Sequence, residues 1–224
     1  MTLAAVPAKQ EISSEEFKMT KTFKILSLFL SYPGEELQAF LGEGVEELHS
    51  EAILESSITD NLRVFASHFT EMDLIEWQAH YVNLFDTSGN TSLYIFEHLK
   101  GDSKERGQAM TDLIDFYEES GYKLKEGELP DYLPAFLEFL SALDIQKASE
   151  LLSQPVNVIN RIYTIMKENN NIYRHVFEAI VSLSPVKPDD EISKYQPGNL
   201  MDAGIDELYE EPPVWPGQQF KTEP

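Results

Sequence analysis

Apolar residues recur at intervals of three and four through most of the chain, which is the spacing of one face of an α-helix. The clearest run is Phe23, Leu26 and Leu30, and it predicts a helix that begins near Thr20 and ends before Pro33. No stretch of the body alternates apolar and polar residues at every second position, as a half-buried strand would. The pattern therefore predicts an all-α protein.

Seven further segments carry the helical spacing, which predicts one domain of eight or nine helices. Asp60, Asp73, and either Asp102 or Ser103 stand where they can cap helix starts, and Gly121 can end a helix in the left-handed conformation. A short apolar run at 93–96 fits either a strand or a helical turn. The predicted helical segments are 35–41, 60–69, 73–85, 103–120, 130–143, 156–166 and 173–181.

The two ends of the chain lack this periodicity. Residues 1–19 are small and polar and predict a disordered extension, with Met19 as a candidate natural start. Residues 185–224 hold seven of the twelve prolines and nine acids against three lysines, a composition that resists regular packing. We therefore expect an all-helical domain over 20–184, followed by an acidic, proline-rich tail that is either disordered or loosely docked.

The charge and the residue types present exclude several classes of protein. Seventeen basic residues against 39 acidic ones give a formal net charge of −22, which repels phosphate backbones and argues against nucleic acid as a partner. Without cysteine, the chain can form no disulfide or thiolate metal site. No apolar stretch reaches the ~18 residues that would predict membrane insertion, and an N-terminus with Glu11 and Glu15 is wrong for an export signal. We expect a cytoplasmic protein whose partners are basic or apolar.

Catalytic and metal-binding motifs were sought and none was found. The chain has no glycine-rich phosphate loop, nucleophile elbow or zinc-protease motif, so the sequence predicts no catalytic residue. A di-iron or di-manganese carboxylate site needs two Glu-x-x-His pairs, and only Glu46 and His49 have that spacing. The sequence therefore predicts no metal site, and a helical carboxylate metalloenzyme is the alternative that metal analysis would exclude.

An acidic run marks residues 34–62, which hold eight acids and neither lysine nor arginine. Such a run is either a solvated face or a surface that steers a basic segment toward the protein. The residues assigned to a steering face are Glu35, Glu36, Glu43, Glu46 and Glu47.

Two segments concentrate charged groups at predicted helix starts. They are FEHLKGDSKERGQAM at 96–110 and ELPDYLPAFLEFL at 128–140. Helix capping would explain Asp102 and Asp131, but it leaves the charged cluster around them unexplained. Because a helix N-terminus carries free N–H groups and partial positive charge, such a junction can hold a carboxylate or an anionic ligand.

Together with the opening FKILSLFLSYP, these segments resemble the NarJ family of nitrate reductase molybdenum cofactor assembly chaperones, which is related to the TorD/DmsD group. The resemblance runs over about 22–183. It implies an all-helical cytoplasmic chaperone that is not an enzyme. Such a chaperone binds the N-terminal segment of the catalytic subunit of a nitrate reductase and assists insertion of the molybdenum guanine dinucleotide cofactor before membrane docking. It retains no cofactor permanently.

The chain departs from the family pattern at Lys100 and Tyr132, where the family usually has histidine, so a mechanism that needs imidazole there does not transfer. Related chaperones serve selenate, chlorate or dimethyl sulfide enzymes, and a general acidic adaptor is a further alternative. Expected partners are the catalytic subunit and proteins of cofactor biosynthesis. The candidate client-binding residues, each of which could instead stabilise the fold, are Glu97, His98, Asp102, Arg106, Gln108, Asp131, Tyr132, Leu133 and Phe136.

Overall fold

The computed structural model describes residues 18–98, 103–125 and 127–189 of the chain. Within these ranges it contains nine α-helices, and the only β interaction is an isolated bridge between Tyr94 and Tyr132. The predicted all-α class is confirmed. The elements are α1 (Lys18–Phe29), α2 (Glu35–Glu51), α3 (Ser56–Glu71), α4 (Leu74–Tyr81), the π-helix η1 (Val82–Asp86), the 3₁₀-helix η2 (Ile95–His98), α5 (Ser103–Glu119), α6 (Leu133–Leu140), α7 (Ile145–Leu152), α8 (Val156–Glu168) and α9 (Arg174–Ser182).

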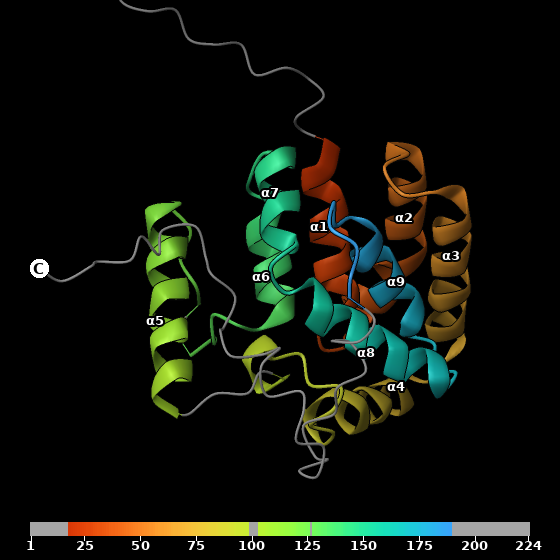
Figure 1. Ribbon diagram of the computed structural model, residues 1–224. Helices are drawn as coiled ribbons and strands as arrows, with labels where there is room; N and C mark the ends of the chain where they lie inside the picture. The colour runs from red at the N-terminus through yellow and green to blue at the C-terminus, as the bar shows by residue number, and fades with distance from the viewer. Residues whose placement is uncertain (1–17, 99–102, 126, 190–224) are drawn as a thin grey trace, which may run out of the picture.

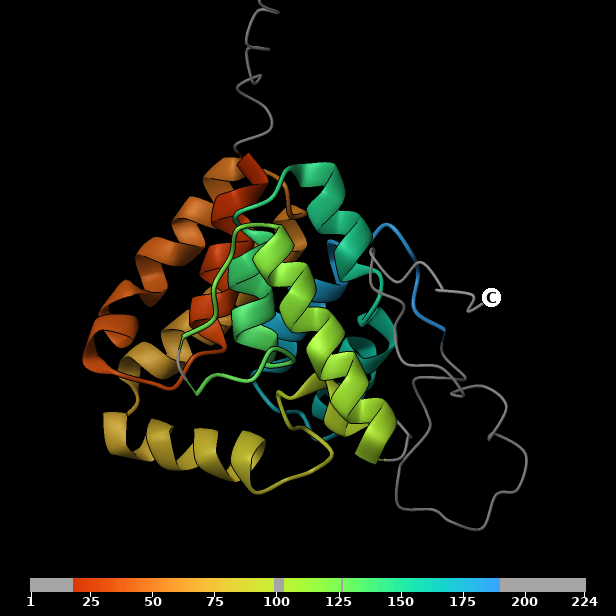
Figure 2. The ribbon, with the colours of Figure 1, turned by 90° about the vertical axis from the view of Figure 1, so that its left-hand side faces the viewer.

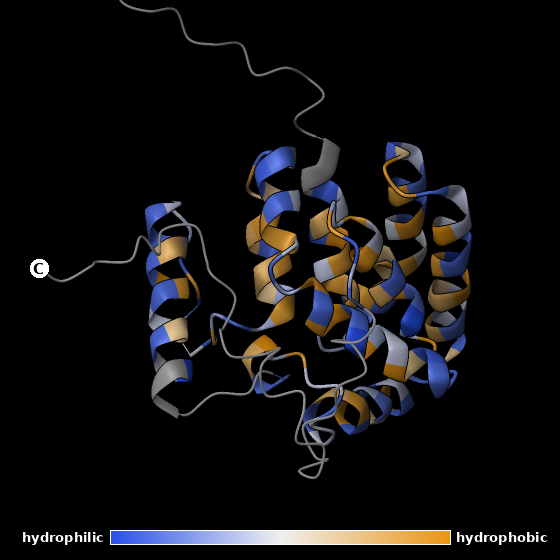
Figure 3. Ribbon diagram, viewed as in Figure 1, coloured by the Kyte–Doolittle hydropathy of each residue, from blue (hydrophilic) through white to orange (hydrophobic). Residues whose placement is uncertain are grey.

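Helix α1 lies at the centre of the bundle (Figure 1). It packs along α6 on one side and against α2 on the other, while α2 pairs with α3 and α8 pairs with α9. Helix α5 stands at the outside, in front of α6 and α7 in the turned view of Figure 2. The apolar residues of the central helices face inward (Figure 3), as the helical spacing of the sequence requires.

Aromatic side chains from α3, α4 and α9 fill the core between these helices. The rings of Phe69 and Trp77 are stacked with centroids 4.7 Å apart, and Phe65 lies edge-on to Phe69 at 5.1 Å. The buried Trp77 Nε1 donates a hydrogen bond to the Tyr173 hydroxyl at 2.8 Å. Each buried aromatic ring contributes about 1.5–3 kcal/mol through removal of apolar surface from water, and the polar atoms of Trp77 and Tyr173 satisfy each other.

Helix α2 is longer than the sequence predicted, since it continues from 41 to Glu51 through two glycines. Gly44 is buried where α2 crosses α1. A Cβ atom there would lie 2.9 Å from Phe40 Cε1 and 3.1 Å from Phe29 Cε1. A glycine that weakens the helix locally is retained because it allows two aromatic rings to approach the backbone.

The predicted helix starts had mixed outcomes. Asp73 caps α4 as predicted, because its Oδ1 accepts hydrogen bonds from the backbone N–H groups of Ile75 at 2.9 Å and Glu76 at 3.3 Å. The prediction for Asp60 is wrong. Helix α3 begins four residues earlier, at Ser56, and Asp60 forms an ion pair with Arg63 instead.

Two features near α5 and α6 refine the helix prediction. Gly121 adopts the left-handed conformation with φ 77° and ends α5 as predicted. The sequence analysis missed α7 as a separate helix. It begins after Asp144, whose side chain accepts a hydrogen bond from the Lys147 N–H at 2.9 Å.

Residues 1–17 and 190–224 lie outside the described ranges, so the division into extension, domain and tail stays a prediction. In the part of the chain that the structure covers, no helix combines the length and the apolar character needed to cross a bilayer.

Candidate functional site

The second motif segment contacts the start of the first motif segment and the residues just before it. The Leu133 N–H donates to the Leu93 carbonyl at 2.8 Å, and the Ile95 N–H donates to the Asp131 carbonyl at 2.9 Å. We call this contact between residues 93–98 and 131–133 the junction. The run at 93–96, which fitted a strand or a helical turn, combines both: a single β-bridge residue followed by the 3₁₀-helix η2.

Asp131 closes the junction from the α6 side. Its Oδ2 accepts a hydrogen bond from the Phe96 N–H at 3.0 Å, so it stabilises the start of η2. The expected cap of its own helix is therefore wrong, because α6 follows Tyr132 without a side-chain cap. Asp131 is fully buried, and its Oδ1 has no hydrogen-bond partner in the ranges that the structure describes. Burial raises the pKa of this carboxyl group, whereas the Phe96 N–H and the charge of Arg106 act in the opposite direction.

His98 is buried at the other side of the junction, with 2% of its surface exposed. Its Nε2 lies 2.8 Å from the Ser92 carbonyl oxygen, which can only accept, so Nε2 carries the proton and Nδ1 is a bare acceptor. Among the described residues, Nδ1 has no hydrogen-bond partner. Burial lowers the pKa of His98, and the charge of the buried Arg161 on α8 lowers it further. His98 is therefore held as a neutral imidazole.

Tyr132 links the junction to α1 and α4. The Tyr81 hydroxyl donates to the Leu30 carbonyl at 2.8 Å and lies 3.2 Å from the Tyr132 hydroxyl. Because the Tyr81 proton is already committed, Tyr132 donates to Tyr81. Burial raises the pKa of both phenols, so both stay protonated. At this position, where the family usually has histidine, the phenol has a structural hydrogen bond.

The exposed part of the candidate site consists of charged and amide side chains. Arg106 Nη2 lies 3.8 Å from Glu97 Oε1, and both side chains are about two-fifths exposed, at 42% and 41%. Gln108 is exposed and donates to Asp112 Oδ1 one turn further along α5, at 2.8 Å. Asp102 lies outside the described residues. Glu97, Arg106 and Gln108 are therefore the candidates that a partner can touch directly.

The remaining candidates are parts of the core. Leu133 and Phe136 are almost completely buried on α6. Together with Asp131 and His98, they hold the exposed charges in place and are not accessible to a partner. In the ranges that the structure describes, no group of three histidine or acidic side chains converges on a point that could hold a metal ion.

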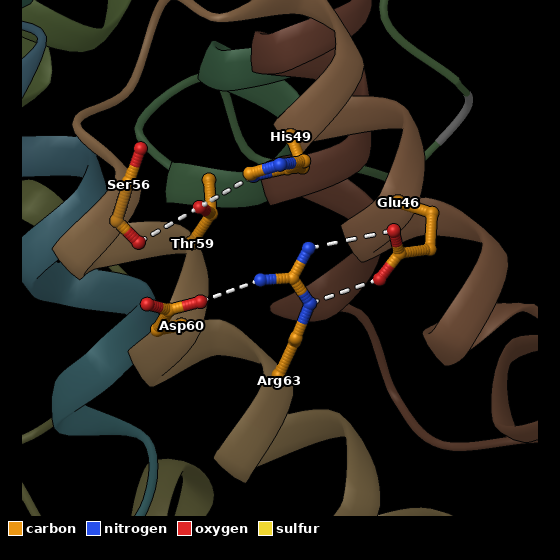
Figure 4. A network of polar contacts seen from close by, with 6 residues as sticks. All are labelled: Glu46, His49, Ser56, Thr59, Asp60 and Arg63. Atoms are coloured by element: carbon orange, nitrogen blue, oxygen red, sulfur yellow. Dashed lines mark hydrogen bonds and ion pairs between the residues drawn. The ribbon is translucent and has the colours of Figure 1, made fainter.

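The residues assigned to the acidic steering face all lie on α2, where two of them form ion pairs and three are exposed. Glu46 accepts from Arg63 Nε on α3 at 2.9 Å, in the polar network drawn in Figure 4. Glu47 accepts from Lys21 on α1 at 2.5 Å. The remaining members, Glu35, Glu36 and Glu43, are exposed.

Sequence reasoning did not identify three residues that support the junction. Tyr81 was assigned only to an apolar stripe, and its hydroxyl gave no separate signal. Ser92 acts through its backbone carbonyl, which no side-chain pattern reveals. Arg161 comes from α8, more than sixty positions further along the chain, and donates to Asn90 Oδ1 at 3.5 Å. In the sequence, the only indication was an arginine within the predicted helical segment 156–166.

The chain resembles known proteins over most of its helical body. The family model of the nitrate reductase delta subunit matches residues 36–177. The nitrate reductase molybdenum cofactor assembly chaperone NarJ of Escherichia coli K12 is 34% identical over 167 residues, which cover 75% of this chain and 71% of that protein. A Bacillus subtilis protein, named as a probable chaperone of the same kind, is 33% identical over 164 residues, covering 72% and 86%.

The fold also has a relative among solved structures. A crystal structure from Archaeoglobus fulgidus, described as that of a redox enzyme maturation protein, superposes with a TM-score of 0.53. The alignment covers 79% of this chain and 98% of that one at 22% identity, so it supports the fold alone.

Proposed function

Because the chain belongs to the nitrate reductase delta subunit family, we propose that it is a dedicated assembly chaperone of a nitrate reductase. The observation that carries the proposal is the family match over residues 36–177, which covers the helical body from α2 into α9 and includes both motif segments. The resemblance drawn from those motifs is confirmed. Relatives that are 33–34% identical over about three quarters of the chain are named as chaperones and not as enzymes.

In this proposal the chain acts in the cytoplasm on the N-terminal segment of the catalytic subunit. It keeps that subunit competent to receive the molybdenum guanine dinucleotide cofactor before the enzyme docks at the membrane. The cofactor is cargo for the client and is not retained by the chaperone. Proteins of cofactor biosynthesis are additional partners in the same proposal.

The junction supplies the proposed client contacts. Glu97 is exposed on η2, which Asp131 and His98 hold from inside, while Arg106 and Gln108 are exposed on α5, where Arg106 lies 3.8 Å from Glu97. Exposed charges around an apolar contact mainly improve orientation and association rate. The strongly negative net charge of the chain suits a basic client segment.

Co-purification with the tagged full chain tests this proposal in nitrate-respiring cells. We expect a large molybdenum-enzyme subunit to be retained. Arg106→Ala should weaken retention about three- to tenfold, because it removes an exposed side chain that orients Glu97 and can donate hydrogen bonds to the client. Lys123→Ala, which removes an exposed cation from the segment after α5, is the matched control and should leave retention unchanged.

Thermal melting of each variant separates binding from folding. If Arg106→Ala lowers stability as much as it lowers retention, Arg106 has no direct role in binding. Absence of any molybdenum-enzyme subunit from the unaltered chain would favour a general acidic adaptor. Recovery of a selenate, chlorate or dimethyl sulfide enzyme would identify a different client of the same type.

A further inference from the structure

A groove of about 530 Å³ opens between α1 and α2. Its lining includes Ile25 and Leu28 of α1, Phe40 of α2, and Ser141, which follows the last residue of α6. The junction lies at the first residues of α6, and an eight-residue helix is about 12 Å long. The groove and the junction are therefore separate surfaces at opposite ends of α6.

The floor of the groove is apolar. Ile25 is buried, and Leu28 and Phe40 are each half-buried, so parts of both side chains face the open space. The Phe40 ring lies close to the α2 backbone because Gly44 has no side chain to displace it. A Cβ atom at position 44 would lie 2.9 Å from Phe40 Cε1, so this ring of the groove floor would have to move to make room.

The rim of the groove on α2 is acidic. Glu36, Phe40, Glu43 and Glu47 are spaced by four, three and four residues, which places them on one face of the helix. Glu43 and Glu47 line the groove with Phe40. Glu36 and Glu43 are exposed, and among the described residues neither forms a hydrogen bond or an ion pair.

The cations that line the groove are already neutralised. Lys21 pairs with Glu47 at 2.5 Å, and Lys24 pairs with Glu138 of α6. The charge left without a partner at the rim is therefore negative. Since seven residues of helix span about 10 Å, Glu36 and Glu43 are spaced to meet basic side chains two turns apart on another helix.

We infer that this groove docks an amphipathic helix of a partner protein that carries lysine or arginine beside its apolar stripe. The apolar stripe enters between α1 and α2, and the basic side chains pair with Glu36 and Glu43. This docking surface goes beyond the client contacts proposed at the junction. It gives the chaperone a second place to hold a partner while the junction is occupied.

The probe that tests the inference is a fluorescein-labelled helical peptide of about four turns, with leucines along one face and lysines beside them. A matched peptide carries glutamate in place of each lysine. We expect anisotropy of the full chain to detect binding of the lysine peptide only. Leu28→Asp should lower its affinity about tenfold or more, because a buried carboxylate would oppose the apolar contact.

Charge variants on the two sides of α2 provide the sharper comparison. Glu43→Gln should weaken the lysine peptide about threefold at low salt, and added salt should remove this difference. Glu35→Gln makes the same change on the first turn of α2, outside the groove lining, and should weaken binding less than Glu43→Gln does. Val64→Asp, at an exposed position of α3, is the matched control for Leu28→Asp.

A photo-crosslinking residue at position 28 guards against a folding defect in Leu28→Asp. It should capture the lysine peptide, whereas the same residue at position 64 should not.

Equal binding to Leu28→Asp and the unaltered chain, or equal losses in Glu35→Gln and Glu43→Gln, would overturn the inference. Retention of the nitrate reductase subunit by Leu28→Asp supports two separate surfaces. If Leu28→Asp and Arg106→Ala each abolish both peptide binding and retention of the nitrate reductase subunit, the proposal of a separate groove site is wrong. Failure of the unaltered chain to retain any client overturns the proposed function and leaves the peptide result standing.

Discussion

The junction and helix α2 both contain acidic residues, but the carboxylates differ in burial and in the partners that they bind. At the junction, Asp131 is fully buried and accepts a hydrogen bond from the backbone of a segment thirty-five positions away. On α2, the carboxylates are exposed or partly exposed: Glu46 pairs with Arg63 of α3 (Figure 4), and Glu47 pairs with Lys21 of α1.

This difference separates residues that hold the fold from residues that are available to partners. A buried carboxylate that satisfies a backbone N–H group cannot be removed without leaving that group unpaired. An exposed ion pair is screened by water and salt and contributes little to stability. Removing one acid should therefore be costly at the junction and nearly neutral on α2.

The largest effect is expected for Asp131→Ala. It leaves the buried Phe96 N–H without an acceptor, and we expect a loss of about 1–3 kcal/mol in the free energy of unfolding. Urea denaturation of the full chain measures it. Asp131→Asn keeps an acceptor oxygen and the side-chain shape, so it should stay close to the unaltered chain. Equal losses in the two variants would show that the carboxylate charge matters more than the hydrogen bond.

An intermediate, pH-dependent effect is expected at His98. Its folded-state pKa is lower than the ordinary value of 6.5 because of burial. As the pH falls below the ordinary value of about 6.5, the unfolded chain takes up the proton before the folded protein does. The contribution of His98 to the free energy of unfolding is therefore complete above pH ~6.5 and is lost as the pH falls toward the lowered folded-state pKa. His98→Gln retains a donor for the Ser92 carbonyl but does not titrate, so its urea midpoint should decline less between pH 7.5 and pH 5.5, a range chosen around the ordinary histidine value of ~6.5.

Two other histidines, the half-buried His80 and the buried His175, limit the size of that change. Burial also lowers the pKa of His80 and His175, so part of the acid sensitivity should remain in His98→Gln. An unchanged pH profile would mean that His98 is not the residue whose protonation opposes folding.

The smallest effect is expected for Glu46→Gln, which removes the partner of Arg63 on the exposed side of α2. Because Arg63 retains Asp60 as a second partner and the pair is exposed, the urea midpoint should not change measurably at physiological salt. A loss as large as that of Asp131→Ala would contradict the contrast between the two regions.

Local pattern was enough to predict the helical class, the starts of α1 and α4, and the end of α5. Asp73 and Gly121 act within a few residues of their own positions, so their roles follow from neighbouring sequence. The prediction was wrong at Asp60 because the capping side chain is instead attracted to Arg63 one turn later. It ended α2 too early because the reason for Gly44 lies in the packing of Phe29 from another helix.

The sequence by itself determined the helical class and the family to which the chain belongs. Only the tertiary structure decided that Asp131 holds η2, that Glu97 and Arg106 remain accessible, and that the acids of α2 divide between a paired side and an open groove. The physical reason is burial. The same carboxylate holds the fold or meets a partner according to how much water surrounds it, and water is excluded by helices that are distant in the sequence.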